Sequence, residues 1–500
     1  MKKLIYLFSG LLMLSCSQED FNIDNPNQPN AAAVLSNAAD FKNFNTTNHT
    51  TLFSNQIGFA GIYFRGLSDQ FTTTNAFRSF WNYCDQPRRQ INNSTSDDDL
   101  AASVASPWGG YNGVINNANI IINNIENQSG SVVVSGNDLT QQELSAAYFD
   151  KGVAQGYLSM IYDKAYIVNP DTDVNALVFS SYTEMLAAAI ANIEKAVSIA
   201  NAQSAITYEI YPGGPAINKA TFIQLANAYM ARFSIGVART NAEALTLDYD
   251  KILTYANNAI TSNFQPESKE DVLFNNLQDW SLFLLGSGAG YMPTDIKIAH
   301  LFQPSYPTDY PTDATILPAV TTSDPRINYY EYVGDKFGFL RASRGRHLFS
   351  SYRHVRFFNG NNENVTGLPC QIFPKAEIDY IKAEAYYRKG DITNAVAMLD
   401  ASPRKTVGNQ STTASADAVR NSLIYENSIE LDLASGMAVN WAFMRRHDLL
   451  QEGSPTMYPV PASELEITQS PIYTFGSPAN KGEVGTASGS NDWRNITLTY

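Results

Sequence analysis

"PKAEIDYIKAEAYYRKGDITNAVAMLD", residues 374–400, contains two runs of helix-forming residues separated by a Gly-Asp turn. In the first run, Ala383 and Ala385 are small enough to let a neighbouring helix approach closely. In the second run, Ala395 and Leu399 recur at helical spacing on one side. The stretch therefore predicts a helical hairpin of the tetratricopeptide type, which buries its faces only by stacking on neighbouring units.

Less regular helical pairs are expected elsewhere, because apolar residues recur at helical spacing in further regions. One of these regions opens with Thr140 and Glu143, the pattern of a capping box. Long insertions separate the pairs, which argues against a regular solenoid. We therefore expect a mainly α fold, built from helical hairpins in a single domain over residues 40–500. The expected pairs lie near residues 108–200, 218–260, 374–400 and 420–450.

Two long insertions, residues 40–107 and 262–372, show little periodicity and are rich in Asn, Thr, Gly, Pro and aromatic residues. Both are too long to be plain loops of a compact domain. We expect short strands and ordered loops in them. Loops held on a rigid scaffold often carry binding sites, so these insertions are the expected place for a ligand.

The N-terminus resembles a bacterial lipoprotein signal. Two lysines precede an apolar run at residues 4–14, which is shorter than the roughly 20 residues of a membrane-spanning helix. The run ends in Met-Leu-Ser before Cys16, a pattern similar to the lipobox in which the cysteine is acylated. We expect a signal peptide over residues 1–15, lipidation at Cys16 and a polar tether over residues 16–39. An ordinary secretory signal with an incidental cysteine is the alternative.

The composition restricts the partners that the protein can have. The formal net charge is −14, and removal of a signal peptide with its two lysines makes it −16. Nucleic acid binding needs a basic surface, so this balance argues against a nucleic acid partner. The other two cysteines, Cys84 and Cys370, could pair in an oxidising envelope, and two buried thiols are the simpler expectation.

Several stretches occur in the order typical of one family, and the chain resembles the SusD/RagB outer-membrane nutrient-binding lipoproteins. The hairpin at residues 374–400 closely resembles the signature helical pair of that family. Residues 425–450 contain a similar Glu-Leu, Gly, Trp and Asp-Leu pattern, and residues 458–468 resemble the closing Pro-x-Pro element. The resemblance also rests on the lipobox at Cys16, "WGGYNGVINNAN" at 108–119, "AAYFDKGVAQGYLSMIYD" at 146–163 and "INKATFIQLANAYMARF" at 217–233.

The resemblance implies a SusD-like, lipid-anchored protein on the cell surface of the outer membrane. It implies capture of a glycan or oligosaccharide, or another oligomeric nutrient, and delivery to a SusC-like TonB-dependent transporter that the protein covers as a hinged lid. The acidic "SQED" at 17–20 is similar to signals that send such lipoproteins to the surface. Neither catalysis nor a cofactor is implied. Two other classes stay open: a surface glycoside hydrolase or peptidase, and a helical-repeat scaffold lipoprotein.

The insertions contain the residue types that carbohydrate binding requires. Aromatic faces contact the C–H surfaces of sugars, while Asn, Asp and Arg bond hydroxyl groups. We expect "PSYPTDYPTD", residues 304–313, to present its tyrosines on a stiff, exposed stretch, because proline restricts the backbone. Core packing is the alternative for each candidate. The candidate ligand residues are Trp81, Tyr83, Arg88, Arg89 and Asn92 in the first insertion, and Asp279, Trp280, Tyr291, Tyr306 and Tyr310 in the second.

Signals for catalysis and metal binding are weak. The sequence lacks a GxSxG elbow and an HExxH pair, and "GSGAG" at 286–290 lacks the Lys-Ser/Thr of a phosphate loop. The aspartates at 97–99 could contact calcium, although a solvated loop is the simpler interpretation. Arginines between residues 341 and 356 could bind an anionic sugar, and salt bridges within an acidic protein are the favoured interpretation. Trp108 and Trp441 lie in helical motifs and are expected in the core.

Overall fold

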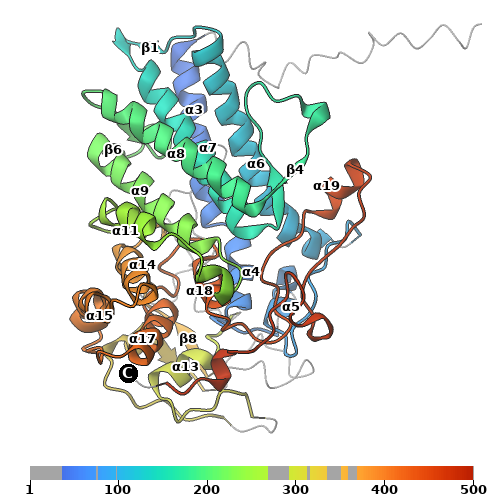
Figure 1. Ribbon diagram of the computed structural model, residues 1–500, viewed down its shortest axis with the longest axis vertical. Helices are drawn as coiled ribbons and strands as arrows, with labels where there is room; N and C mark the ends of the chain where they lie inside the picture. The colour runs from blue at the N-terminus through green and yellow to red at the C-terminus, as the bar shows by residue number, and fades with distance from the viewer. Residues whose placement is uncertain are drawn as a thin grey trace, which may run out of the picture.

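A computed structural model of the chain describes residues 37–74, 77–96, 98–267, 292–311, 316–334, 351–357 and 369–498. The predictions for Cys16, Asp279, Trp280 and Tyr291 lie outside these residues. Helices make up most of the described part, and short antiparallel strand pairs lie between them (Figure 1). The expected mainly α fold with short-strand insertions is confirmed.

The elements follow one another in a simple order along the chain. The helices are α3 (Ala38–Gln56), α4 (Ala60–Leu67), α5 (Trp81–Cys84), α6 (Asp98–Asn127), α7 (Thr140–Ile161), α8 (Tyr182–Ala202), α9 (Lys219–Gly236), α10 (Asn241–Ala244), α11 (Tyr249–Asn257), α13 (Ile296–Phe302), α14 (Lys375–Arg388), α15 (Ile392–Ala401), α16 (Pro403–Thr406), α17 (Ala416–Ile429), α18 (Val439–Arg446) and α19 (Ala462–Ile467). The short 3-10 helices η2 (Phe77–Ser79) and η4 (Pro325–Tyr329) precede α5 and β7. The antiparallel strand pairs are β1 (Val133–Val134) with β2 (Asn137–Asp138), β3 (Lys164–Tyr166) with β4 (Phe179–Ser181), β5 (Thr207–Glu209) with β6 (Ala216–Asn218), and β7 (Tyr330–Tyr332) with β8 (Tyr352–His354).

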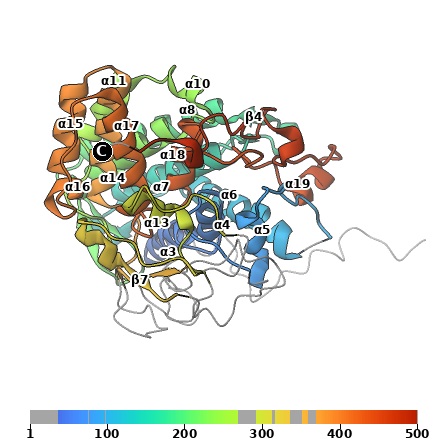
Figure 2. The ribbon, with the colours of Figure 1, turned by 90° about the horizontal axis from the view of Figure 1, so that it is seen from below.

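The helices stack as successive pairs down the length of the molecule. In Figure 1, α3, α6, α7 and α8 occupy the upper half, α9 and α11 follow, and α14, α15 and α17 form the lower end. Figure 2 shows α14, α15 and α17 grouped at one side of the molecule, away from α5 and α19. The α14–α15 hairpin is the one that the sequence predicts. Ala383, Ala385, Ala395 and Leu399 are each 0% exposed, so the small and apolar positions do pack as expected.

Residues 38–67 form α3 and α4, so the expectation of strands and loops throughout residues 40–107 is wrong. α3 is rich in Asn and Thr, which have low helix propensity, and it has no apolar stripe. Its polar side chains are instead buried against α7. Asn45 donates a hydrogen bond of 2.7 Å to the carboxylate of Glu143, and His49 pairs with Asp150. Hydrogen bonds to α7 therefore hold a helix that its own sequence pattern does not indicate.

The capping box predicted from Thr140 and Glu143 is wrong. α7 begins without a side-chain cap, and the Thr140 hydroxyl donates to Asp138 at 2.6 Å. The Glu143 carboxylate is used by α3 instead. A capping box does form at the start of α8, where Ser181 and Glu184 exchange hydrogen bonds. Local capping patterns thus compete with tertiary contacts for the same carboxylate.

Cys84 and Cys370 are buried thiols outside any disulfide, which confirms the simpler of the two expectations for them. None of the helices in the described ranges combines the length and the apolar composition that a membrane crossing needs. Within those ranges, no group of three or more His, Cys, Asp and Glu side chains is placed to hold a metal ion. The side chains of residues 97–99, considered above for calcium, lie outside the described set.

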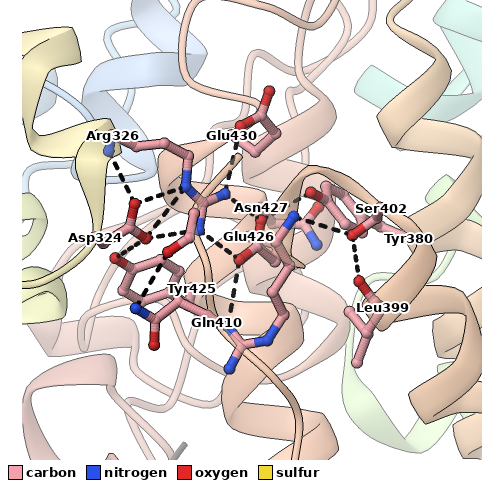
Figure 3. A network of polar contacts seen from close by, with 12 residues as sticks. Asp324, Arg326, Tyr380, Leu399, Ser402, Gln410, Tyr425, Glu426, Asn427 and Glu430 are labelled. Atoms are coloured by element: carbon pink, nitrogen blue, oxygen red, sulfur yellow. Dashed lines mark hydrogen bonds and ion pairs between the residues drawn. The ribbon is translucent and has the colours of Figure 1, made fainter. Parts of the chain in front are cut away.

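A buried network of charges joins the second insertion to the helical scaffold (Figure 3). Arg326 of η4 is 0% exposed and donates to Glu426 of α17 at 2.6 Å and to Asp324 at 2.8 Å. Tyr380 of α14 donates to the same Glu426 at 2.7 Å, and Arg404 of α16 lies 3.3 Å from it. A buried guanidinium is stable only where such partners replace its hydration. The network therefore fixes the insertion on the α14–α17 end of the scaffold.

Arg326→Ala is expected to destabilise the protein by about 3–5 kcal/mol, because it leaves carboxylates buried without their main partner. Denaturant unfolding measures the change. Lys251→Ala is the control, since Lys251 lies 3.7 Å from Glu194 at an exposed surface. The control should change stability by less than about 1 kcal/mol. Equally small changes in both variants would mean that the network does not stabilise the fold.

Candidate ligand-binding site

A hollow of about 180 Å³ lies beside α5, and we call it the α5 pocket. Its wall comes mainly from residues 82–92, with contributions from α4 and from the C-terminal part of the chain. Four of the candidate ligand residues line it, and Trp81 stands just before them at the first position of α5. The lining residues are Leu67, Asn82, Tyr83, Arg88, Arg89, Gln90, Ile91, Asn92 and Pro455.

Hydrogen bonds to the C-terminal segment fix the pocket wall. The Ile91 amide donates to the Phe475 carbonyl at 2.9 Å, and the Thr474 hydroxyl donates to the Ile91 carbonyl at 2.6 Å. Two residues further on, the Asn93 side chain donates to the Val460 carbonyl at 2.8 Å. The wall is therefore held by residues far away in the sequence, in a segment that has little regular structure of its own.

Trp81 is half-buried, and the guanidinium of Arg89 lies 4.6 Å from the centre of its ring. The Arg89 side chain is 53% exposed and pairs with Asp85, four residues before it. A cation over an indole at an exposed position contributes about 0.5–1 kcal/mol. A sugar ring that stacks on the same face must displace the guanidinium, which is then free to bond hydroxyl groups at the edge of the sugar.

Sequence reasoning missed an aromatic surface that precedes α5. Phe77 is 48% exposed, its ring centre lies 6.5 Å from that of Phe59, and the Arg78 guanidinium lies 4.5 Å from the Phe59 ring. Phe77 is four residues before Trp81, so the density of aromatic residues there was a usable signal. Phe59 lies at the start of α4, and its sequence position gave no sign of this contact.

Tyr83 and Arg88 line the pocket from buried positions, where other groups of the protein bond the Tyr83 hydroxyl and two of the three guanidinium nitrogens of Arg88. The Tyr83 hydroxyl shares a hydrogen bond with Ser103, and burial raises the pKa of Tyr83 to about 12. Arg88 pairs with Asp69 and donates to the Tyr83 carbonyl at 2.8 Å. Because Asp69 compensates the charge of Arg88, these two residues form the floor of the pocket, and the exposed polar groups are those of Arg89 and its neighbours.

Tyr306 and Tyr310 are only 6% and 7% exposed, so the expectation of an exposed proline-rich stretch is wrong for them. The Tyr306 hydroxyl donates to the Pro318 carbonyl at 3.1 Å, and the Tyr310 hydroxyl accepts a 2.8 Å hydrogen bond from the Ile296 amide. Proline stiffens the backbone without deciding where a ring points, and burial of the rings beside α13 prevails. Neither tyrosine lines the α5 pocket.

The remaining aromatic and basic residues follow their expectations where the structure describes them. Trp108 and Trp441 are 6% and 0% exposed and belong to the core. Arg353 and Arg356 each pair with a glutamate, which confirms the salt-bridge interpretation for these two. The rest of that arginine-rich run, residues 341–350, lies outside the described residues.

A buried group of charges surrounds Asp69, the partner of Arg88. Burial and the Asp69 charge raise the pKa of Asp295 to about 7, and burial lowers the pKa of Lys297 to about 8. Burial also raises the pKa of Asp432 to about 6, against the attraction of Arg65. The floor of the α5 pocket thus continues into a buried group of charges in which the pKa values of Asp295 and Asp432 are raised.

Comparison with solved structures defines the class of this fold. A SusD superfamily protein from Bacteroides vulgatus aligns with a TM-score of 0.57 at 14% identity, over 86% of this chain and 97% of that chain. A SusD-like carbohydrate binding protein from Bacteroides vulgatus aligns with a TM-score of 0.56 at 15% identity, over 84% and 86%. Surface glycan-binding protein A from Bacteroides uniformis aligns with a TM-score of 0.52 at 13% identity, over 79% of this chain and 86% of that chain.

The chain therefore has the SusD-like fold across most of its length, and the resemblance seen in the sequence is confirmed at the level of the fold. No family model and no curated protein sequence matches the chain. The fold relationship thus rests on three-dimensional similarity at low sequence identity.

Asp432→Asn should change the pH dependence of stability. Between pH 3.8 and about 6 the folded protein keeps a proton on Asp432 that the unfolded chain has lost, so its contribution to stability falls as pH rises through this window. Over the whole window, the titration of Asp432 changes the free energy of unfolding by about 3 kcal/mol. Asparagine does not titrate. The free energy of unfolding of the variant, relative to that of wild type, should therefore rise by up to that amount between pH 4 and pH 7. Denaturant unfolding at both pH values measures it, and a constant difference would contradict the assignment.

Proposed function

We propose that this protein is a cell-surface lipoprotein that captures a glycan or oligosaccharide and delivers it to a SusC-like TonB-dependent outer-membrane transporter. It shares its fold with proteins described as carbohydrate binding and glycan binding. The observation that carries the proposal is the half-buried ring of Trp81 beside a pocket whose wall contains several amide side chains.

The α5 pocket offers both kinds of contact that a sugar needs. The indole of Trp81 can contact the C–H face of a pyranose, and aromatic contacts of this kind contribute about 0.5–1.5 kcal/mol beyond area burial in protein pairs. Gln90 and Asn92 line the pocket with groups that donate and accept hydrogen bonds, which suits hydroxyl groups. Arg89 adds donors at the edge of the same ring. Several weak contacts together give useful affinity.

The composition of the pocket supports binding without turnover. Glycoside hydrolysis in most families uses two carboxylates that flank the scissile bond, about 5–10 Å apart. The described residues that line the α5 pocket include neither Asp nor Glu. Asp85 is the nearest acid in the sequence, and it is paired with Arg89. The glycoside hydrolase alternative therefore finds no support at this site.

Trp81→Ala is expected to weaken binding of the captured glycan at least tenfold, because the pocket loses its stacking surface. Titration calorimetry of the purified protein against soluble polysaccharides, oligosaccharides and oligopeptides identifies the ligand. Tyr148→Ala is a matched control, since Tyr148 is a partly exposed ring on α7 bonded to Glu126. The control should bind like wild type.

Equal affinity of wild type and Trp81→Ala would refute stacking of the ligand on Trp81, the contact that the proposal requires. The same mixtures are analysed for products by chromatography. Release of shortened saccharides or peptides would contradict the proposal of a binding protein and revive the hydrolase alternative. Arg89→Ala distinguishes two roles of the Arg89 side chain. Tighter ligand binding in the variant means that the guanidinium competes with the ligand for the indole, and weaker binding means that the guanidinium contacts the ligand.

Cys16→Ala should abolish lipid attachment, because the acyl chains are expected on the sulfur of that residue. Growth of the producing bacterium with labelled palmitate, followed by purification of the protein, measures the attachment. Cys84→Ser is the control: Cys84 is buried in the folded protein and should leave labelling unchanged. Retained label in Cys16→Ala would refute the anchor.

A further inference from the structure

A second hollow, of about 360 Å³, lies where the end of α18 meets the start of α10 and the loop of residues 482–489. We call it the Arg239 pocket. Its size falls within the range of small-molecule sites, about 300–1,000 Å³. It shares no lining residue with the α5 pocket, although Pro455 lines one hollow and Thr456 the other. The site is therefore distinct from the one assigned to the glycan.

Two arginines, Arg239 and Arg445, line this pocket and are each 1% exposed. Arg445 donates to the carbonyls of Gly236 and Met160 at 2.6 and 2.8 Å. Arg239 donates to the carbonyls of Met160 and Tyr162 at 2.5 and 2.9 Å. The carbonyls of Gly236, Met160 and Tyr162 lie at the C-terminal ends of α7 and α9 and carry only partial negative charge. The other two nitrogens of Arg445 donate to the Ala238 and Thr456 carbonyls at 3.1 and 2.9 Å, so each nitrogen of this guanidinium has a partner. In the described part of the chain, neither guanidinium forms an ion pair with a carboxylate.

Backbone carbonyls and the attraction of Glu243 compensate only part of the positive charge at the base of the pocket. The buried Nε–H of Arg239 has no hydrogen-bond partner among the described residues. Burial lowers the pKa of Arg239 to about 10. Burial, together with the repulsion of Arg239, lowers the pKa of Arg445 well below its usual range. A negative group beside the Nε–H of Arg239 would gain that hydrogen bond and offset the repulsion between the two guanidinium groups.

The outer part of the pocket has the opposite charge. Glu243 and Asp448 line it from partly exposed positions. Glu243 accepts a hydrogen bond of 2.9 Å from the Arg239 amide, and Asp448 accepts one of 3.0 Å from the Asn241 amide, so backbone contacts hold both carboxylates in place. The pocket is thus positive at its buried base and negative at its rim. A purely anionic ligand would be repelled at the rim.

Apolar side chains complete the wall. Leu450 and Met457 line the pocket and are 0% and 5% exposed. Met457 keeps a small apolar surface between the two charged zones, whereas Leu450 is fully covered by its neighbours. The loop of residues 482–489 closes the other side with glycines at positive φ, which lets the backbone turn tightly around the hollow.

We propose that the Arg239 pocket binds a small zwitterion with an aliphatic side chain, of the class of α-amino acids. The carboxylate of the ligand lies against Arg239 and Arg445, and its ammonium group lies against Glu243 and Asp448. The aliphatic part packs on Met457. Guanidinium groups match carboxylates in shape and charge, and the opposite charge at the rim selects the ammonium group.

Titration of the purified protein with L-leucine tests the proposal, with two analogues that each lack one charge. N-acetyl-L-leucine lacks the ammonium group, and L-leucinamide lacks the carboxylate. We expect L-leucine to bind with a Kd below about 1 mM. Each analogue should bind at least about tenfold more weakly, because one of the two charged contacts is lost. Absence of L-leucine binding, or equal binding of all three compounds, would overturn the proposal.

Glu243→Gln locates the site without disturbing the fold, because the amide oxygen can still accept the Arg239 N–H. The variant should bind L-leucine roughly fivefold more weakly than wild type does, and its affinity for N-acetyl-L-leucine should not fall. Ala242→Lys, at an exposed lining position, should also weaken L-leucine by adding a positive charge at the rim. Glu194→Gln, which changes an exposed carboxylate on α8, is the matched control.

Equal effects of Glu243→Gln and Glu194→Gln on L-leucine would overturn the assignment of the rim. Trp81→Ala should leave L-leucine binding unchanged, because the two pockets share no lining residue. Loss of L-leucine binding in that variant would place the zwitterion in the α5 pocket and refute a separate site.

Discussion

Arg232 of α9 lies at the point where the scaffold helices meet. It is 2% exposed, and its guanidinium donates to both carboxylate oxygens of Glu377 on α14 at 2.7 Å and to the Tyr157 hydroxyl on α7 at 2.8 Å. A guanidinium that has lost its hydration is stable only where such partners are fixed, so this one contact sets how α7, α9 and α14 lie relative to one another. The close approach also needs small residues: a Cβ atom at Gly156 would lie 2.2 Å from the ring of Phe233. The position of every segment attached to these helices follows from this packing.

The same requirement extends from the scaffold to the irregular segments. The ion pairs of Arg326 fix the second insertion (Figure 3), and the ion pair of Asp69 with Arg88 fixes the floor of the α5 pocket. The pocket wall is then held by hydrogen bonds to the segment around Phe475. Trp81 and Arg89 therefore project from a site that is ordered before a ligand arrives, which reduces the entropy lost on binding. On this fold, buried charge pairs determine where the loops around the α5 pocket lie.

The sequence predicts the elements whose pattern is local and misses those that depend on distant partners. The α14–α15 hairpin follows from Ala383, Ala385 and Leu399, and the residues around Trp81 follow from an unusual concentration of aromatic and basic side chains. α3 could not be predicted, because its Asn and Thr side chains are held by hydrogen bonds to α6, to α7 and to Ile210, which lie far away in the sequence. The burial of Tyr306 and Tyr310 was also out of reach, since proline spacing does not reveal which way a ring points. The contact of Phe59 with Phe77 and the lining of the Arg239 pocket each join separate segments of the chain. A single sequence does not show that these segments lie close together.

We propose that residues 77–92, held in place by the C-terminal segment, form the surface that captures a carbohydrate. Hydrogen–deuterium exchange, with and without the saccharide that titration identifies, tests it most directly because it reports on every segment at once. The account predicts slower exchange in residues 77–92 and in residues 453–476, with no change in the α14–α15 hairpin. Protection confined to the loop of residues 482–489, or protection that spares residues 77–92, would contradict the claim.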